Sequence, residues 1–120
     1  MNKRSFGSVG EYDVHDYLIG QGYAIRAMNY RKGPGEIDVI AEKGGVIAFI
    51  EVKRRTTLRY GTPAEAVTPA KRRRVIRTAL LYLQENRLLG HSIRFDIVEI
   101  TPGRLNHIQN AFDATGMRGI

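Results

Sequence analysis

The stretch from residue 35 to residue 55, GEIDVIAEKGGVIAFIEVKRR, constrains the fold more than any other part of the chain. Two apolar runs flank Gly44 and Gly45, and paired glycines supply the positive φ angles that a tight hairpin turn requires. If these glycines form the turn, Lys43 faces Val46, and all later cross-strand pairs have residue numbers that sum to 89. The sequence therefore predicts an antiparallel hairpin of defined register.

This register places charged side chains inside the hairpin. Asp38 falls opposite Glu51 and Glu36 falls opposite Lys53, and all four share one face because side chains alternate along a strand. The other face then carries Ile37, Val39, Val46, Ala48, Ile50 and Val52. Directly opposed carboxylates destabilise a sheet, and a pair of oxygen ligands with an open side suits Mg2+. The alternative is a solvent-facing polar side that binds no metal.

Basic residues are concentrated directly after the hairpin. The whole chain carries a net charge of +7, whereas the segment from Lys53 to Arg77 alone has nine basic residues and one acidic residue, a net charge of +8. Such a segment favours a polyanion, most commonly a phosphate backbone, although a solvated helix face is the alternative for the KRRR run. Tyr60, within this segment, could stack on a base or anchor its own loop. The residues expected to contact nucleic acid are Arg54, Arg55, Lys71, Arg72, Arg73, Arg74 and Arg77.

Length and composition indicate a single domain over residues 1–120, with frayed ends at 1–7 and 113–120. The chain has no cysteine, which excludes disulfides, thiolate zinc sites and cysteine nucleophiles. No apolar run is long enough to span a bilayer, so we expect no membrane association. These features fit a cytoplasmic protein.

Periodicity and chain breakers predict two helices and three strands besides the hairpin. Thr68 is a good N-cap and Pro69 suits a first helical position, so a helix should begin there. The predicted helices cover residues 8–19 and 68–86, and the further strands cover residues 23–31, 93–100 and 105–112. The order α-β-β-β-α-β-β predicts an α/β fold with one mixed sheet flanked by helices.

The first predicted helix contains another unexpected carboxylate. Glu11, Val14, His15 and Leu18 follow the spacing of a buried face, so Glu11 occupies an apolar position. A buried carboxylate needs a cation or strong donors. Alternatively, Glu11 lies at the frayed helix start, where acids interact well with the helix dipole. His15 could approach the same site, but a histidine on a helix surface is more often incidental.

Together, Glu11, Asp38 and the EVK sequence of residues 51–53 resemble the active-site pattern of the restriction-endonuclease-like, PD-(D/E)XK nuclease superfamily. The chain resembles the YraN-type uncharacterised protein family of bacteria more closely. The matching stretches cover nearly the whole chain after residue 7 and are GSVGEYDVHDYL, QGYAIRAMNYR, GEIDVIAEKGGVIAFIEVKRR, YGTPAEAVTPAKRRRVIRTALLYL, IRFDIVEI and HIQNAF.

The resemblance implies a restriction-endonuclease-like sheet flanked by helices, kinship with archaeal Holliday-junction resolvases, and a metal-dependent nuclease site. It assigns Asp38, Glu51 and Glu11 as ligands of Mg2+ or Mn2+ and Lys53 as the catalytic lysine, while Glu36 matches the GEID motif in a supporting role. It also raises the expectation of a homodimer.

These features predict a metal-dependent endonuclease that hydrolyses phosphodiester bonds in structured or damaged DNA. Two alternatives remain open. One is a non-catalytic nucleic-acid-binding module of the same fold, and the other is an adaptor whose basic surface meets an acidic protein.

Overall fold

The computed structural model describes residues 11–55 and 67–114, except for the side chains of Glu11 and Tyr12. Its elements follow the order predicted from the sequence, so that prediction is confirmed. They are α1 (Glu11–Gly20), β1 (Ala24–Lys32), β2 (Gly35–Lys43), β3 (Val46–Arg54), α2 (Pro69–Glu85), β4 (Ser92–Thr101) and β5 (Arg104–Phe112).

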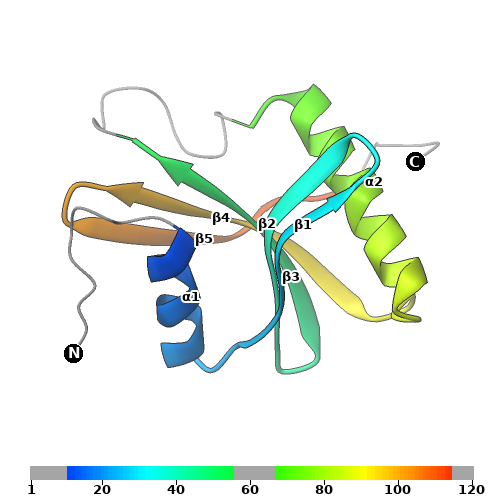
Figure 1. Ribbon diagram of the computed structural model, residues 1–120, viewed down its shortest axis with the longest axis horizontal. Helices are drawn as coiled ribbons and strands as arrows, with labels where there is room; N and C mark the ends of the chain where they lie inside the picture. The colour runs from blue at the N-terminus through cyan, green and yellow to red at the C-terminus, as the bar shows by residue number, and fades with distance from the viewer. Residues whose placement is uncertain (1–10, 56–66, 115–120) are drawn as a thin grey trace.

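The five strands form one mixed sheet in the order β1-β2-β3-β4-β5. Only β3 and β4 pair in parallel, because α2 connects them and allows the chain to return in the same direction. One buried core lies between α2 and the sheet, and a second lies between α1 and the sheet (Figure 1). The central strands are therefore buried on both faces, as predicted for a sheet flanked by helices.

The hairpin between β2 and β3 has the predicted register near its turn. Gly44 and Gly45 both have positive φ angles, and the antiparallel pairing runs from Lys43–Val46 to Val39–Ile50. The glycine pair thus sets the alignment of the two central strands, as the sequence predicts.

Beyond the Val39–Ile50 pair, β2 and β3 separate. The β2 strand stays paired with β1 as far as Gly35, whereas β3 stays paired with β4 as far as Arg54. Figure 1 shows the two strands diverging into a fork. The predicted direct opposition of Asp38 to Glu51, and of Glu36 to Lys53, is therefore wrong, because the ladder ends one pair too early.

Strand faces also differ from the prediction. Val39, Ala48 and Ile50 pack on the α1 side as expected, but Ile37 belongs to the core beneath α2. The face that carries the carboxylates is not a solvent-facing polar side, since Ile40, Ile47 and Phe49 on it also pack beneath α2. The alternative of a solvent-facing polar side is therefore wrong, because α2 covers this face.

Helix α2 begins where the sequence predicts. The Thr68 hydroxyl accepts a hydrogen bond from the Lys71 backbone N–H at 3.2 Å, and Pro69 is the first helical residue. Thr78 and Tyr82 are buried together with Val75 and Ala79, at the spacing of one helix face.

The start of β2 lies tightly against α2. A Cβ atom on Gly35 would fall 1.8 Å from Thr78 Oγ1 and 3.3 Å from the Arg74 carbonyl oxygen. Only glycine permits this approach, and the contact holds one arm of the fork against the helix. Neither described helix is long and apolar enough to cross a membrane.

Candidate active site

Glu51 lies at the fork, on the face of β3 that α2 covers. Only 3% of its surface is exposed, although a glutamate is rarely buried to this extent without strong partners. Its Oε2 atom is buried and accepts no hydrogen bond from any group of residues 13–55 and 67–114. A buried polar atom left in this state is costly, so it calls for a functional explanation.

Asp38 lies on the other arm of the fork. Its Oδ2 atom accepts a hydrogen bond of 2.7 Å from the backbone N–H of Val52. The aspartate side chain thus takes the place of a strand partner where the ladder between β2 and β3 has ended. This bond fixes one carboxylate beside the strand segment that carries Glu51.

Lys71 reaches the same site from the first turn of α2. Its Nζ atom lies 3.4 Å from Glu51 Oε1, and about a third of the lysine side chain is exposed. This distance is longer than that of a strong charge-assisted hydrogen bond, which measures roughly 2.7 to 2.9 Å. The sequence predicted Lys71 only as a nucleic-acid contact, so its position inside the site was missed.

The pKa of Glu51 depends on its burial and on the charges around it. Burial raises the pKa of Glu51 to about 7, and the nearby charge of Asp38 adds to this rise. The ammonium groups of Lys71 and Lys53 act in the opposite direction. Because burial and Asp38 prevail, Glu51 is poised to gain or lose a proton near neutral pH.

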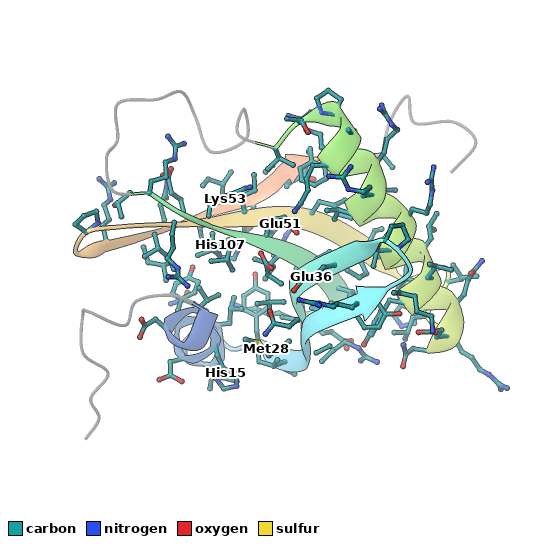
Figure 2. The ribbon with its side chains drawn as sticks, turned by 45° about the horizontal axis from the view of Figure 1, so that its top comes forward. His15, Met28, Glu36, Glu51, Lys53 and His107 are labelled. Atoms are coloured by element: carbon teal, nitrogen blue, oxygen red, sulfur yellow. The ribbon has the colours of Figure 1, made fainter. Side chains whose placement is uncertain are left out.

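Lys53 follows Glu51 on the same strand and is half-buried. Figure 2 shows Glu51 and Lys53 on β3 and Glu36 on β2. Glu36 forms an ion pair with Arg31 at 3.6 Å, and in the sheet Lys53 is aligned with Glu99 of β4. The predicted cross-strand pairing of Glu36 with Lys53 therefore does not form.

Helix α1 contributes less to the described site than the sequence suggested. Val14 and Leu18 are fully buried as predicted, but the His15 side chain is 40% exposed and pairs with Asp16. His15 thus fits the favoured interpretation of an incidental histidine on the helix surface. The side chain of Glu11 lies outside the described part of the chain, and the described side chains contain no group of three His, Asp or Glu placed to hold a metal.

The predicted nucleic-acid contacts divide into two groups. Arg55 pairs with Glu99 at 2.6 Å, and Arg72 donates a 2.9 Å hydrogen bond to the Val67 carbonyl and lies over the Phe112 ring. The side chains of both arginines are therefore fixed by contacts within the protein. Tyr60 lies outside the described residues. The exposed arginines of the set are Arg54, Arg73, Arg74 and Arg77.

A second buried carboxylate, Asp96 of β4, lies on the α1 side of the sheet and is fully satisfied. Arg94 and His107 contact its oxygens at 2.8 to 3.2 Å, and the Asn110 backbone N–H donates at 2.9 Å. Burial alone would raise the pKa of Asp96, but these donors together hold it below its ordinary value. His107 also bonds Tyr17 of α1 at 2.9 Å, so the cluster ties α1 to β4 and β5.

Sequence reasoning gave Asp96 and His107 no role. The available signal was the presence of Asp96 and Glu99 within the strand-like run IRFDIVEI, which is the same anomaly that drew attention to Glu51. Arg94 lies only two residues from Asp96, but the other donors, His107 and Asn110, are more than ten residues away and reach Asp96 only in the folded sheet.

The mixed five-stranded sheet flanked by two helices defines an α/β protein with a restriction-endonuclease-like fold. Hjc, a Holliday junction resolvase from Archaeoglobus fulgidus, superposes with a TM-score of 0.52 at 17% identity, covering 88% of this chain and 78% of that chain. The match confirms the predicted fold.

The chain belongs to the uncharacterised protein family UPF0102, whose model matches residues 10–100. A UPF0102 protein of Symbiobacterium thermophilum is 49% identical, covering 92% of this chain and 98% of the relative. A UPF0102 protein of Lachnoclostridium phytofermentans is 45% identical, covering 97% and 99%. The predicted family resemblance is thereby confirmed.

Proposed function

We propose that this protein is a divalent-metal-dependent nuclease that hydrolyses phosphodiester bonds in structured or damaged DNA. The observation that carries the proposal is the buried Glu51 carboxylate, which lies near the charge of Asp38 and has one oxygen that no group in the described part of the chain satisfies. Two carboxylates held close together fit Mg2+ or Mn2+, because a cation would satisfy the buried oxygen and cancel the repulsion.

Each residue at the fork has a role in this proposal. Asp38 and Glu51 would hold the ion, with Glu11 as a further ligand from α1. A bound divalent ion supplies Lewis acidity and lowers the pKa of a coordinated water. Lys53 supplies a positive charge beside Glu51, suited to stabilising negative charge that develops on a phosphate.

The exposed arginines supply a surface for the DNA backbone. Arg73, Arg74 and Arg77 lie on α2, the helix whose first turn carries Lys71 to the fork, and Arg54 ends β3. Such a surface gives affinity without reading sequence, because arginine contacts phosphates independently of the bases. A homodimer, proposed from the resemblance to resolvases, would present two such surfaces.

The test is cleavage of linear, flapped and four-way-junction DNA in Mg2+ and in Mn2+. We expect wild type to cut at least one branched substrate and Glu51→Gln to cut none, while Glu51→Gln binds DNA at least as tightly because it has lost a negative charge. Glu42→Gln is the matched control, since it removes the same charge from the other end of the same hairpin.

Two results would count against nuclease activity: no cleavage by wild type with either metal, or equal cleavage by Glu51→Gln. DNA binding in the absence of cleavage would instead support the non-catalytic binding module. Binding by an acidic protein, with no affinity for DNA, would support the adaptor.

The salt dependence of DNA binding tests the arginine surface. Each neutralised phosphate contributes about 0.9 to the log-log slope on duplex DNA, so replacing Arg73, Arg74 and Arg77 with alanine should reduce the slope by about 2 to 3. Arg87→Ala, at the far end of α2, should change it little. An unchanged slope in the triple variant would exclude this face as the DNA contact.

A further inference from the structure

Lys71 is placed differently from the other basic residues of α2. The N-cap at Thr68 fixes the first turn of the helix, and the Lys71 side chain lies against Glu51 at 3.4 Å, whereas neighbouring Arg73 is exposed. The ammonium group is thus the nearest described cation to the carboxylate proposed to bind metal.

We infer that Lys71 is a positioning residue that acts as a built-in counter-cation of Glu51 and competes with the divalent ion for its carboxylate. This inference rests on the proposed function, because it concerns how the same site is loaded. Glu51 is almost fully buried beside Asp38, so a nearby positive charge stabilises its ionised form when no metal is bound.

The geometry suits displacement. Lys71 contacts only one of the two Glu51 oxygens, at a distance that makes a weak bond, and its side chain is partly exposed. A lysine side chain is long and flexible, so its ammonium can leave the carboxylate for solvent or for a DNA phosphate. Binding of a phosphate to Lys71 would then favour metal binding, and metal binding would favour DNA binding equally.

The test is Mn2+ binding to the whole protein without DNA, measured from the loss of the free-ion electron paramagnetic resonance signal at pH 8.5, where protons compete little. Lys71→Met removes the competing charge and should tighten Mn2+ binding about fivefold to tenfold. Lys71→Arg keeps a cation that can contact both carboxylate oxygens, so it should bind Mn2+ more weakly than wild type. Arg73→Met, which removes an equal charge from the same helix, should bind like wild type.

The inference is supported if Mn2+ binds most tightly to Lys71→Met, less tightly to wild type and least tightly to Lys71→Arg. Equal or weaker binding by Lys71→Met would overturn it, as would an equal gain in Arg73→Met, because the effect would then be general electrostatics. These failures leave the proposed function intact if Glu51→Gln still loses Mn2+ binding. If wild type binds no Mn2+, the proposed metal site and this inference both fail.

Discussion

Two buried carboxylates on neighbouring strands behave in opposite ways. Asp96 of β4 is fully buried and receives hydrogen bonds from two side chains and a backbone N–H, so it is held as an anion. Glu51 of β3 is buried almost as deeply, yet within residues 13–55 and 67–114 it has one weak ion pair and one oxygen without a hydrogen bond. The two lie on opposite faces of the same sheet.

The difference separates a structural carboxylate from a functional one. The donors of Asp96 join α1 to β4 and β5, so its burial is offset within the fold itself. The free-energy cost of burying Glu51 is offset only in part by other groups of the protein. A protein retains such a carboxylate where a bound ligand supplies the missing partner. Glu51 should therefore cost the isolated protein stability, whereas Asp96 should contribute to it.

The largest effect should come from Asp96→Asn. The substitution leaves Arg94 and His107 facing a neutral amide in a buried site, and loss of one partner of a buried ion pair costs about 3 to 5 kcal/mol. Urea unfolding at pH 7 should show this loss. The pKa of Asp96 is lowered by folding, so its contribution is present above about pH 4, the ordinary value, and is lost as pH falls through the lower folded value.

Asp16→Asn, an exposed carboxylate on α1, is the control and should change stability by less than about 0.5 kcal/mol. If Asp96→Asn costs no more than this control, the hydrogen bonds to Asp96 do not carry the stability assigned to them.

Glu51→Gln should stabilise the folded protein, whereas Asp96→Asn should destabilise it. Folding raises the pKa of Glu51 from 4.5 to about 7, so ionised Glu51 destabilises the folded state. This cost is absent below pH 4.5, grows as pH rises, and is complete above pH 7. Glu51→Gln should therefore be more stable than wild type by about 1 to 3 kcal/mol at pH 8, and the gain should vanish near pH 4.5.

Thermal and urea unfolding without divalent metal would measure this difference, with Glu42→Gln as the control for the loss of a partly exposed carboxylate that pairs with Arg26. A Glu51→Gln variant that is less stable than wild type at pH 8 would mean that the carboxylate is well satisfied. The contrast with Asp96 would then disappear.

A smaller effect is expected from the contact that holds the fork against α2. The methyl group that Gly35→Ala adds would overlap Thr78 Oγ1. Overpacking of this kind lowers the free energy of unfolding by about 1 to 3 kcal/mol. In a Thr78→Ala background the same change should cost about half as much, because the nearest obstructing atom is gone.

Gly35→Ala should also add its cost independently to that of Asp96→Asn, since the two sites lie on opposite faces of the sheet. Equal costs of Gly35→Ala with and without Thr78 would show that the clash does not control the position of this arm. Double-mutant cycles from urea unfolding would settle the point.

Local signals predicted much of the fold. The glycine pair fixed the register of the β2–β3 hairpin as far as Val39, and Thr68 with Pro69 marked the start of α2. Both features depend on residues close together in the chain, so the sequence carries them directly. Asp38 and Glu51 were selected as site residues because charge is unexpected in a strand-like run, and Lys53 was assigned through the family resemblance.

The arrangement of the site could not be predicted in the same way. The fork arises because β2 follows β1 while β3 follows β4, and that choice depends on pairings across the whole sheet. Lys71 reaches Glu51 only because α2 packs over this face, and helical periodicity does not reveal which strand residue it meets. The predicted pairing of Asp38 with Glu51 failed for the same reason, although both residues do meet at the fork.

The most direct test of the central claim is anomalous scattering from crystals soaked in Mn2+. We expect a manganese peak at the fork, bound by oxygens of Asp38 and Glu51, and we expect the peak to be absent from Glu51→Gln crystals soaked in the same way. A wild-type crystal without a peak at the fork, or a peak that persists in Glu51→Gln, would contradict the assignment of this buried carboxylate as a metal ligand.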